Sequence, residues 1–398
     1  MNPHRFIVGQ LGARMHYAVP RILHSAGMLE RFYTDICAVR GWPRLLKAVP
    51  APLRPAPVRR LLGRLPHGVP PALITAFTAL GTEYARRRAR AQTPSEMTAA
   101  HLWAGRAFCE EIVRRGLTGA TGVYTFNSAG LEVLQAARAR GLRCVMEQTI
   151  APRAVERRLL TEEQARFPDW EPMPSADAHA AEFCAREEAE WAQADVILTG
   201  SEFVRDGIAA CGGPVERCAV VPYGVDPSFT IPERPAHAGP LRVLVVGAVG
   251  LRKGSPYVLE AARLLNGTAQ IRMVGAGGDR MHTAVELPGP VPRAEIGEQY
   301  AWADVFLLPS LCEGSATVVY EALAAGLPVI CTPNTGSVVR DGIDGFIVPI
   351  RNAPAIAAKL ELLAAKPTLR AELGRNARVR AAEFTLAQYG QRLVAALC

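Results

Sequence analysis

Glu313 and Glu321 are two carboxylates with seven residues between them, the first in a loop and the second one turn inside the following helical pattern. The first intervening residues are small, so a ligand could approach the backbone closely. The free amides at the helix start, strengthened by the helix dipole, would form an anion site. A diphosphate held there would leave Glu321 to accept hydrogen bonds from ribose hydroxyls, and Glu313 to accept them from a sugar beyond the phosphates. The predicted ligand-contacting residues are Glu313, Gly314, Ser315, Ala316, Thr317, Val318 and Glu321.

Arg252 and Lys253 are adjacent cations at the point where a predicted strand turns into a helix. This edge is where doubly wound sheets bind their ligands, and the two charges would neutralise a departing diphosphate. The glycine spacing over 247–254 matches neither a dinucleotide fingerprint nor a P-loop, which disfavours a dehydrogenase and an NTPase. The spacing of Glu313 and Glu321 alone is more typical of an ordinary loop residue and a surface helix residue. The motifs around them must therefore decide whether they bind a ligand.

The elements that must position these residues alternate between strand and helix patterns from residue 241 onward. This alternation is typical of a doubly wound parallel sheet covered by helices. The N-terminal half repeats it less regularly, and the proline- and glycine-rich stretch 226–240 indicates a linker. We therefore expect an α/β protein of two domains with a boundary near residue 236. Strands are predicted at 6–8, 122–126, 144–147, 196–199, 219–221, 241–247, 269–274, 304–308, 328–331 and 345–349, and helices at 253–265, 292–303 and 317–325.

The composition is that of an ordinary globular protein, with 398 residues of which 49% are hydrophobic and 21% charged. Nine cysteines without a Cys-x-x-Cys pair argue against a zinc cage and a disulfide framework. No apolar run approaches the roughly 18 residues of a membrane-spanning helix, and no signal peptide is evident, so we expect a cytoplasmic protein. The net charge of +8 favours anionic partners: nucleic acid, anionic lipid or a phosphate-bearing substrate.

The segment 36–82 differs from the rest of the chain, because it holds seven Lys or Arg residues, eight prolines and no carboxylate. The prolines exclude one long helix. A solvated basic loop and a surface that contacts anionic lipid or a charged acceptor are both compatible with this pattern. Leucines are interspersed with the cations, and each cation near an anionic bilayer could contribute about 1 kcal/mol.

Taken in order along the chain, these motifs resemble the retaining glycosyltransferases of family four, which have the GT-B fold of two Rossmann-like domains facing a central cleft. The resemblance implies an acceptor-binding domain over 1–236 and a nucleotide-sugar-binding domain over 237–383. It further implies that the last helix, about 384–398, packs back on the first domain. The residues that carry the resemblance are 9–14, 194–201, 221–226, 252–254, 313–321, 326–330 and 341–347.

The same resemblance implies roles for single residues. Gly12 and Ala13 would contact the donor, and Arg252, Lys253 and Glu313 would be catalytic. Many members carry an Arg directly after the glycine of the first C-terminal strand; this chain has Ala248 there, and we expect Arg252 to take over the contact. Members also often have a His near the acceptor, where this chain reads Met146-Glu147-Gln148. The acceptor candidates are therefore Glu147 and His16. His16 is the nearest imidazole, and the alternative interpretation is that it is an ordinary surface histidine.

Family resemblance implies transfer of a sugar from a nucleotide sugar with retention at the anomeric carbon, with the leaving phosphate oxygen taking the acceptor proton. No Asp-x-Asp pair is present, so no metal or other cofactor is expected. The acceptor would be a sugar, a lipid-linked molecule or a small molecule, with a possible anionic membrane surface. The alternatives are a non-hydrolysing nucleotide-sugar epimerase and a non-catalytic nucleotide- or nucleic-acid-binding protein. Nucleic acid is disfavoured because the basic segment lacks interleaved aromatic residues.

Overall fold

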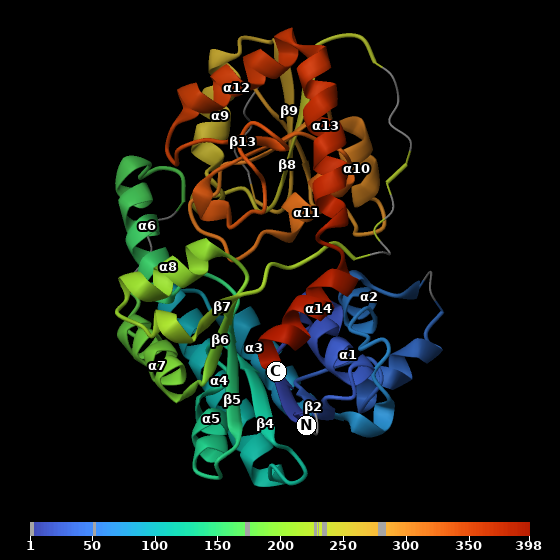
Figure 1. Cartoon of the computed structure of the whole chain (residues 1–398), viewed down its shortest axis with the longest axis vertical. Coiled ribbons are helices and arrows are strands. Elements are labelled where there is room, and N and C mark those ends of the chain that lie inside the picture. Colours follow the sequence, from blue (N-terminus) through green and yellow to red (C-terminus); the bar gives the residue numbers. More distant parts are fainter. Residues whose placement is uncertain are drawn as a thin grey trace.

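The computed structural model describes residues 4–50, 53–171, 176–226, 229, 231–232, 237–277 and 284–398. Two Rossmann-like domains follow one another along the chain, each with a parallel sheet between helices (Figure 1). The predicted fold class, with two doubly wound sheets, is confirmed. The predicted boundary at residue 236 lies outside the described residues.

In the described part of the chain, the N-terminal sheet has seven parallel strands: β1 (Phe6–Gln10), β2 (Leu29–Thr34), β3 (Ile74–Ala76), β4 (Gly122–Phe126), β5 (Arg143–Gln148), β6 (Val196–Thr199) and β7 (Cys218–Val220). Their order across the sheet is β3-β2-β1-β4-β5-β6-β7. Every residue of β1 and β4 is buried, as expected for central strands that are covered on both faces.

The C-terminal sheet has, among the residues that the structure describes, six parallel strands: β8 (Leu241–Val246), β9 (Ala269–Val274), β10 (Glu286–Gly289), β11 (Val305–Leu308), β12 (Val329–Cys331) and β13 (Gly345–Ile347). Their order is β10-β9-β8-β11-β12-β13. In both sheets the strand order reverses beside the first strand, between β1 and β4 and between β8 and β11. The loops at the carboxyl edge of such a switch point are where doubly wound sheets bind ligands.

Helices cover both sheets, and several begin at sequence signals. Thr93 and Glu96 form a capping box at the start of α4, and Thr385 and Gln388 form another at the start of α14. The helices are α1 (Ala18–Ser25), α2 (Ala56–Leu62), α3 (Thr78–Arg90), α4 (Pro94–Arg115), α5 (Leu131–Arg138), α6 (Arg153–Arg166), α7 (Ala180–Gln193), α8 (Glu202–Ala210), α9 (Ser255–Leu264), α10 (Ile296–Trp302), α11 (Thr317–Ala324), α12 (Ala353–Ala365), α13 (Pro367–Ala382) and α14 (Leu386–Leu397). The short 3-10 turns are η1 (Arg14–Tyr17), η2 (Trp42–Ala48), η4 (Pro71–Leu73), η5 (Val215–Arg217), η6 (Leu251–Lys253) and η7 (Pro333–Thr335).

The last helix, α14, returns to the N-terminal domain, where Figure 1 shows it in red beside α1. Tyr389, Leu393 and Leu397 are buried in the same apolar cluster as Phe6 and Tyr17. The chain therefore crosses between the domains a second time, and α14 is part of the N-terminal core.

Helix α6 makes a further connection between the domains (Figure 1). Glu163 on α6 is fully buried, and its Oε2 accepts a hydrogen bond of 2.7 Å from the hydroxyl of Tyr257 on α9. Arg351 of the C-terminal domain forms an ion pair with Glu163 and another of 2.8 Å with Glu162. A buried carboxylate needs such partners, so these contacts hold α6 against the C-terminal domain.

Three strands were not predicted from the sequence. β3 and β10 are short edge strands, and β10 contains Pro288, which only an edge tolerates. β2 contains Glu30 and Arg31 among its apolar residues, which hides its strand pattern. The predicted helix over 253–265 begins only at Ser255, because Gly254 adopts a left-handed conformation with φ of 70°. No helix among the described residues combines the length and the apolar composition needed to cross a membrane.

Candidate active site

A cavity of about 530 Å³ lies where the loops after β8 and β11 face the loops after β1 and β5. Both sheets thus contribute the carboxyl edges at which their strand order reverses. The structure brings most of the predicted residues together around this one cavity. Those that line it are Ala13, His16, Arg252, Lys253, Glu313, Gly314, Ser315, Ala316, Thr317, Val318 and Glu321.

Glu313 is the centre of a three-residue charge cluster. Its Oε1 lies 2.7 Å from Nζ of Lys253 and 2.9 Å from Nη1 of Arg252. Arg252 also donates to the carbonyl oxygen of Cys312 at 3.0 Å. Two cations that share one carboxylate leave a net positive charge at the cavity wall. That charge suits an anionic ligand.

The turn that carries Arg252 and Lys253 is held on two sides. The amide of Leu251 donates to Oε1 of Glu171 at 2.7 Å. Gly254 ends the turn, and a Cβ atom on it would lie 2.1 Å from the carbonyl oxygen of Pro309. Glycine is therefore required at this position, and the two cations are presented by a rigid turn rather than by a free loop.

Helix α11 begins at the cavity wall, where its first residues line the cavity. Within the described part of the chain, the amides of Ala316, Thr317 and Val318 donate to no carbonyl or side-chain oxygen. The first N–H groups of a helix have no intrahelical partner, so they are available to an anion. The residues of the predicted anion site therefore lie together at the start of α11.

Glu321 is buried on the first turns of α11 and already has two partners. Its Oε2 accepts a hydrogen bond of 2.8 Å from the hydroxyl of Tyr300, and its Oε1 forms an ion pair with Arg293. Burial, followed by the charge of Glu321, raises the pKa of Tyr300 well above its usual value, so this hydroxyl remains a donor. Arg293 also lines the cavity. Arg293 could not be recognised from the sequence, because no motif surrounds it.

The loop after β1 forms the opposite wall. The Gln10 side-chain amide donates to the carbonyl oxygens of Gly12 at 3.2 Å and Arg14 at 3.0 Å. Met15, His16 and Tyr17 then have φ of 45°, 49° and 61°. Three consecutive non-glycine residues in this region are rare and strained. The turn places the exposed His16 at the cavity.

The domains meet beside the charge cluster. The carbonyl oxygen of Gly314 accepts a hydrogen bond of 2.5 Å from the hydroxyl of Ser201, at the start of α8. The carbonyl oxygen of Glu313 accepts one of 3.3 Å from the amide of Ala151. A Cβ atom on Gly314 would lie 2.0 Å from the carbonyl oxygen of Thr149. The glycine therefore allows close approach between the domains.

Glu147 lies in the core rather than at a cavity, although it was predicted to contact an acceptor. It is 2% exposed, and its Oε1 accepts a hydrogen bond of 2.7 Å from the hydroxyl of Tyr223. The hydroxyl of Tyr124 donates to its other oxygen. Burial raises the pKa of Glu147. Because two tyrosines cover this carboxylate, the structure corrects the predicted acceptor role.

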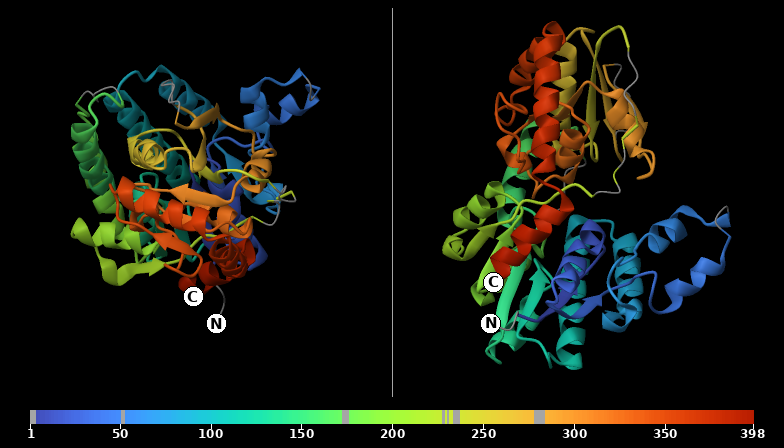
Figure 2. Two further views of the ribbon diagram at one scale, coloured as in Figure 1. Left: turned by 90° about the horizontal axis from the view of Figure 1, so that it is seen from above. Right: turned by 45° about the vertical axis from the view of Figure 1, so that its right-hand side comes forward.

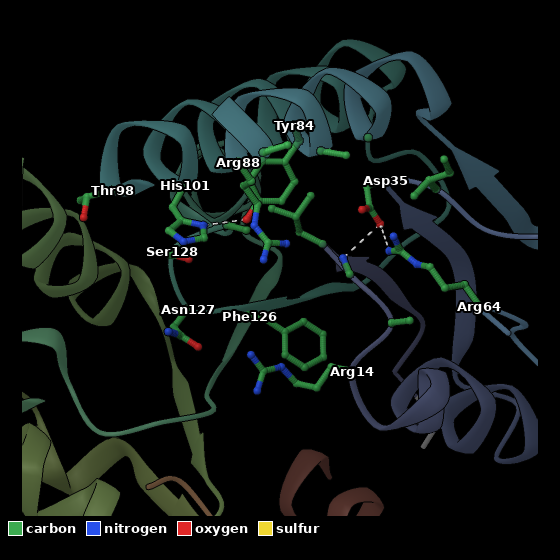
Figure 3. Close-up of a pocket in the computed structure, with 18 of the residues that line it drawn as sticks. Arg14, Asp35, Arg64, Tyr84, Arg88, Thr98, His101, Phe126, Asn127 and Ser128 are labelled. Carbon is green, nitrogen blue, oxygen red and sulfur yellow. Dashed lines mark hydrogen bonds and ion pairs between the residues drawn. The ribbon is translucent and has the colours of Figure 1, made fainter. Parts of the chain in front are cut away.

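A second and larger cavity, of about 1020 Å³, lies in the N-terminal domain (Figure 3). It is lined from the loop after β1, from α3 and α4, and from the loops after β4 and β5. Gly12, predicted to contact the donor, lines this cavity and not the smaller one; its amide donates to Asp35 at 3.0 Å. Ala13, Arg14 and Ile150 line both cavities, so the two are adjacent.

No group of three or more His, Cys, Asp or Glu side chains among the described residues is arranged to hold a metal ion.

Known proteins are similar to this chain in part of its sequence and in its fold. Residues 240–366 match the family model described as Glycosyl transferases group 1. The amylovoran biosynthesis glycosyltransferase AmsK of Erwinia amylovora is 31% identical over 194 residues, which is 43% of this chain and 47% of AmsK. The chain thus spans about half the length of the curated relatives that it matches.

Solved structures match over nearly the whole chain. Sucrose-phosphate synthase from Thermosynechococcus elongatus has a TM-score of 0.66 at 16% identity, covering 98% of this chain and 97% of that one. HepE of Anabaena, in complex with UDP and glucose, has a TM-score of 0.62 at 13% identity, covering 98% of each chain. These structural matches confirm the predicted fold, GT-B, with its two Rossmann-like domains. Over residues 240–366 the chain is similar to the glycosyl transferases of group 1.

Proposed function

We propose that this chain transfers a sugar from a nucleotide-sugar donor to an acceptor hydroxyl, with retention at the anomeric carbon and without a metal ion. The observation that carries the proposal is the convergence of the Glu313 charge cluster, the free amides of α11 and Glu321 on one cavity between the domains. Each group matches a different part of a nucleotide sugar.

The donor would lie along the C-terminal wall. The ribose hydroxyls would donate to Glu321, which can accept further hydrogen bonds because each carboxylate oxygen has two lone pairs. The diphosphate would bind the α11 amides, close to Arg252 and Lys253. The sugar would then extend toward Glu313. The two cations would stabilise the charge that develops on the leaving diphosphate, the task for which other enzymes use a divalent ion.

In the proposed reaction, the bond between the anomeric carbon and the diphosphate oxygen breaks as the acceptor oxygen bonds to the same carbon from the same face. The acceptor proton passes to the leaving phosphate oxygen, so no protein base is required. The protein's contribution is positioning of both substrates and stabilisation of the departing charge.

The decisive experiment is a turnover assay with a panel of nucleotide sugars in the presence of EDTA. UDP-glucose comes first, because a solved neighbour binds UDP and glucose. We expect one donor to be consumed with EDTA present, and the anomeric proton of the product to retain the configuration of the donor by NMR. An inverted product, or complete loss of turnover with EDTA, contradicts the proposal. Conversion of the donor to its epimer without acceptor indicates the epimerase alternative.

We further propose that the basic segment rests on an anionic membrane surface. The segments η2 and α2 project from the N-terminal domain (Figure 2). Trp42, Leu45 and Leu53 expose 46%, 66% and 71% of their surface there. Exposed apolar side chains beside unopposed cations are typical of a peripheral membrane contact.

Not every cation of this segment is available to lipid. Arg64 forms an ion pair of 2.6 Å with Asp35, and Arg54 donates to backbone carbonyl oxygens. The informative variant therefore replaces the exposed Arg44 and Lys47 by serine. Wild-type protein should co-sediment with anionic vesicles at low salt, and this variant should not. Wild-type protein that remains in the supernatant contradicts the membrane proposal.

A further inference from the structure

We propose that the larger N-terminal cavity binds a phosphate or diphosphate group of the acceptor, with Arg14 and Arg88 as the contacting residues. This inference rests on the proposed transferase function and specifies the chemical class of its acceptor. The recognised group is a phosphoryl group next to a sugar. A phosphorylated sugar and a lipid-linked diphosphate both carry such a group.

The charge balance of the cavity is the first observation. Among the described residues, six arginines line it against three carboxylates: Arg14, Arg60, Arg64, Arg86, Arg88 and Arg153 against Asp35, Glu156 and Glu187. The carboxylates already have partners. Asp35 is paired with Arg64, and Glu156 with Arg153 at 2.8 Å. Glu187 accepts hydrogen bonds from the Gln148 side chain and the Arg153 amide.

The remaining arginines have no such partner. Within the described part of the chain, Arg14, Arg60, Arg86 and Arg88 form no ion pair with a carboxylate. Figure 3 shows Arg14 and Arg88 extending into the cavity from opposite walls, one from the loop after β1 and the other from α3. Guanidinium groups on two walls of one cavity match a phosphoryl group, whose oxygens accept paired N–H donors.

The pKa of His101 is sensitive to the positive charges that line the cavity. Its Nδ1 lies 2.7 Å from the hydroxyl of Tyr84, and both side chains line the cavity beside Arg88 (Figure 3). Burial lowers the pKa of His101, and the charges of Arg88 and Arg153 lower it further. A bound anion would offset that repulsion. An anion bound beside Arg88 would therefore raise the pKa of His101.

The position of the cavity connects this anion to the reaction. Arg14 also lines the donor cavity, together with Glu313 and His16. A phosphoryl group held between Arg14 and Arg88 would place the attached sugar toward the donor cavity, where its hydroxyl could meet the anomeric carbon. The remaining wall includes Leu11, Ile36 and Phe126, so an apolar group could extend from the phosphate.

Calorimetric titration of inorganic pyrophosphate into the full chain tests the inference. Arg88→Ser and Arg14→Ser should each weaken binding at least about tenfold, because each removes charge-assisted hydrogen bonds. Arg90→Ser is the matched control, since Arg90 ends the same helix α3 without lining the cavity. Circular dichroism verifies that each variant is folded. Equal affinity in Arg88→Ser, Arg14→Ser and wild type overturns the inference.

A second variant separates this inference from the proposed function. Lys253→Ala, in the donor cavity, should leave pyrophosphate binding at the arginines unchanged and should impair turnover of the donor. Pyrophosphate binding that depends on Lys253 and not on Arg88 overturns the acceptor inference and leaves the transferase intact. Normal turnover in Lys253→Ala contradicts the proposed donor site and leaves the arginine site standing.

Two readouts identify the source of the phosphate and its location. Geranyl diphosphate that binds more tightly than pyrophosphate, in an Arg88-dependent way, supports a lipid-linked acceptor; tighter Arg88-dependent binding of glucose 1-phosphate supports a phosphorylated sugar. In NMR titrations, assigned with His101→Gln, pyrophosphate should raise the pKa of His101, because a nearby anion stabilises the imidazolium. An unchanged His101 pKa at saturating pyrophosphate overturns the location.

Discussion

Replacing Gly314 by alanine should separate the two domains at the active site while each domain remains folded. A Cβ atom on Gly314 would lie 2.0 Å from the carbonyl oxygen of Thr149, whereas real Cβ atoms essentially never come within 3.0 Å of such an atom. The loops after β5 and β11 would therefore have to move apart by about 1 Å, the difference between these distances. That movement would also weaken the hydrogen bonds from Ser201 and Ala151 to this loop.

The magnitude follows from the cost of adding a methyl group to a closely packed contact. Such overpacking costs about 1–3 kcal/mol. Because about 1.4 kcal/mol corresponds to a tenfold change, the closed arrangement should become about 5- to 150-fold less populated. We expect kcat/KM to fall by a similar factor, since Glu313 on the C-terminal side and His16 on the N-terminal side must face the same cavity.

Donor turnover and small-angle scattering measure the two consequences. Gly314→Ala should lower kcat/KM and enlarge the radius of gyration. Gly63→Ala is the control, because its Cβ atom would meet no heavy atom closer than 3.5 Å and its φ is −73°. Wild-type turnover together with an unchanged radius of gyration in Gly314→Ala would refute the idea that this contact holds the domains together.

Three further substitutions test single contacts. Glu321→Ala should weaken nucleotide binding by about 1.5–3 kcal/mol in calorimetry, the contribution of a hydrogen bond to a charged group; an unchanged affinity would contradict the ribose assignment. Lys253→Ala should lower kcat more than donor affinity, because its charge matters most as the diphosphate departs. A raised KM with intact kcat would show a binding role instead. Tyr257→Phe should reduce the free energy of unfolding in urea by about 1–3 kcal/mol, because the buried Glu163 loses a donor; an unchanged denaturation midpoint would contradict this.

The sequence predicted the fold where strands are continuous apolar runs. β8 and β11 are central strands of this kind, and their burial on both faces leaves a clear pattern. β10 could not be recognised in the same way, because an edge strand needs fewer apolar residues and tolerates Pro288. The contact of α6 with the C-terminal domain was also invisible, since Glu163 resembles any other glutamate of a charged helix until Tyr257 and Arg351 are brought beside it.

Site residues could be predicted where they lie in one continuous motif, and not where the fold brings distant residues together. The proposed donor side lies in continuous motifs, so Lys253 and Glu313 could be chosen from local sequence alone. The arginines of the larger cavity come from separate elements, and only the fold brings Arg14 and Arg88 to one space. Glu147 was misassigned because a charged residue at a strand end usually faces the ligand edge, whereas the hydroxyls of Tyr124 and Tyr223 allow it to be buried.

Glu313 takes part in two proposed tasks, which are to hold the cations Arg252 and Lys253 and to accept a hydrogen bond from a sugar hydroxyl. Its Oε1 positions both Arg252 and Lys253, while within the described part of the chain its Oε2 has no hydrogen-bond partner. One oxygen therefore holds the cations where a diphosphate would depart, and the other remains available to a sugar hydroxyl. A donor whose sugar hydroxyl contacts Oε2 and whose diphosphate contacts the two cations would be positioned by Glu313. The same carboxylate arranges the cations that stabilise the departing charge. Small displacements of the Glu313 loop should then affect donor orientation and leaving-group stabilisation together. The tight packing of Gly314 against the N-terminal domain therefore matters for the reaction as well as for domain closure.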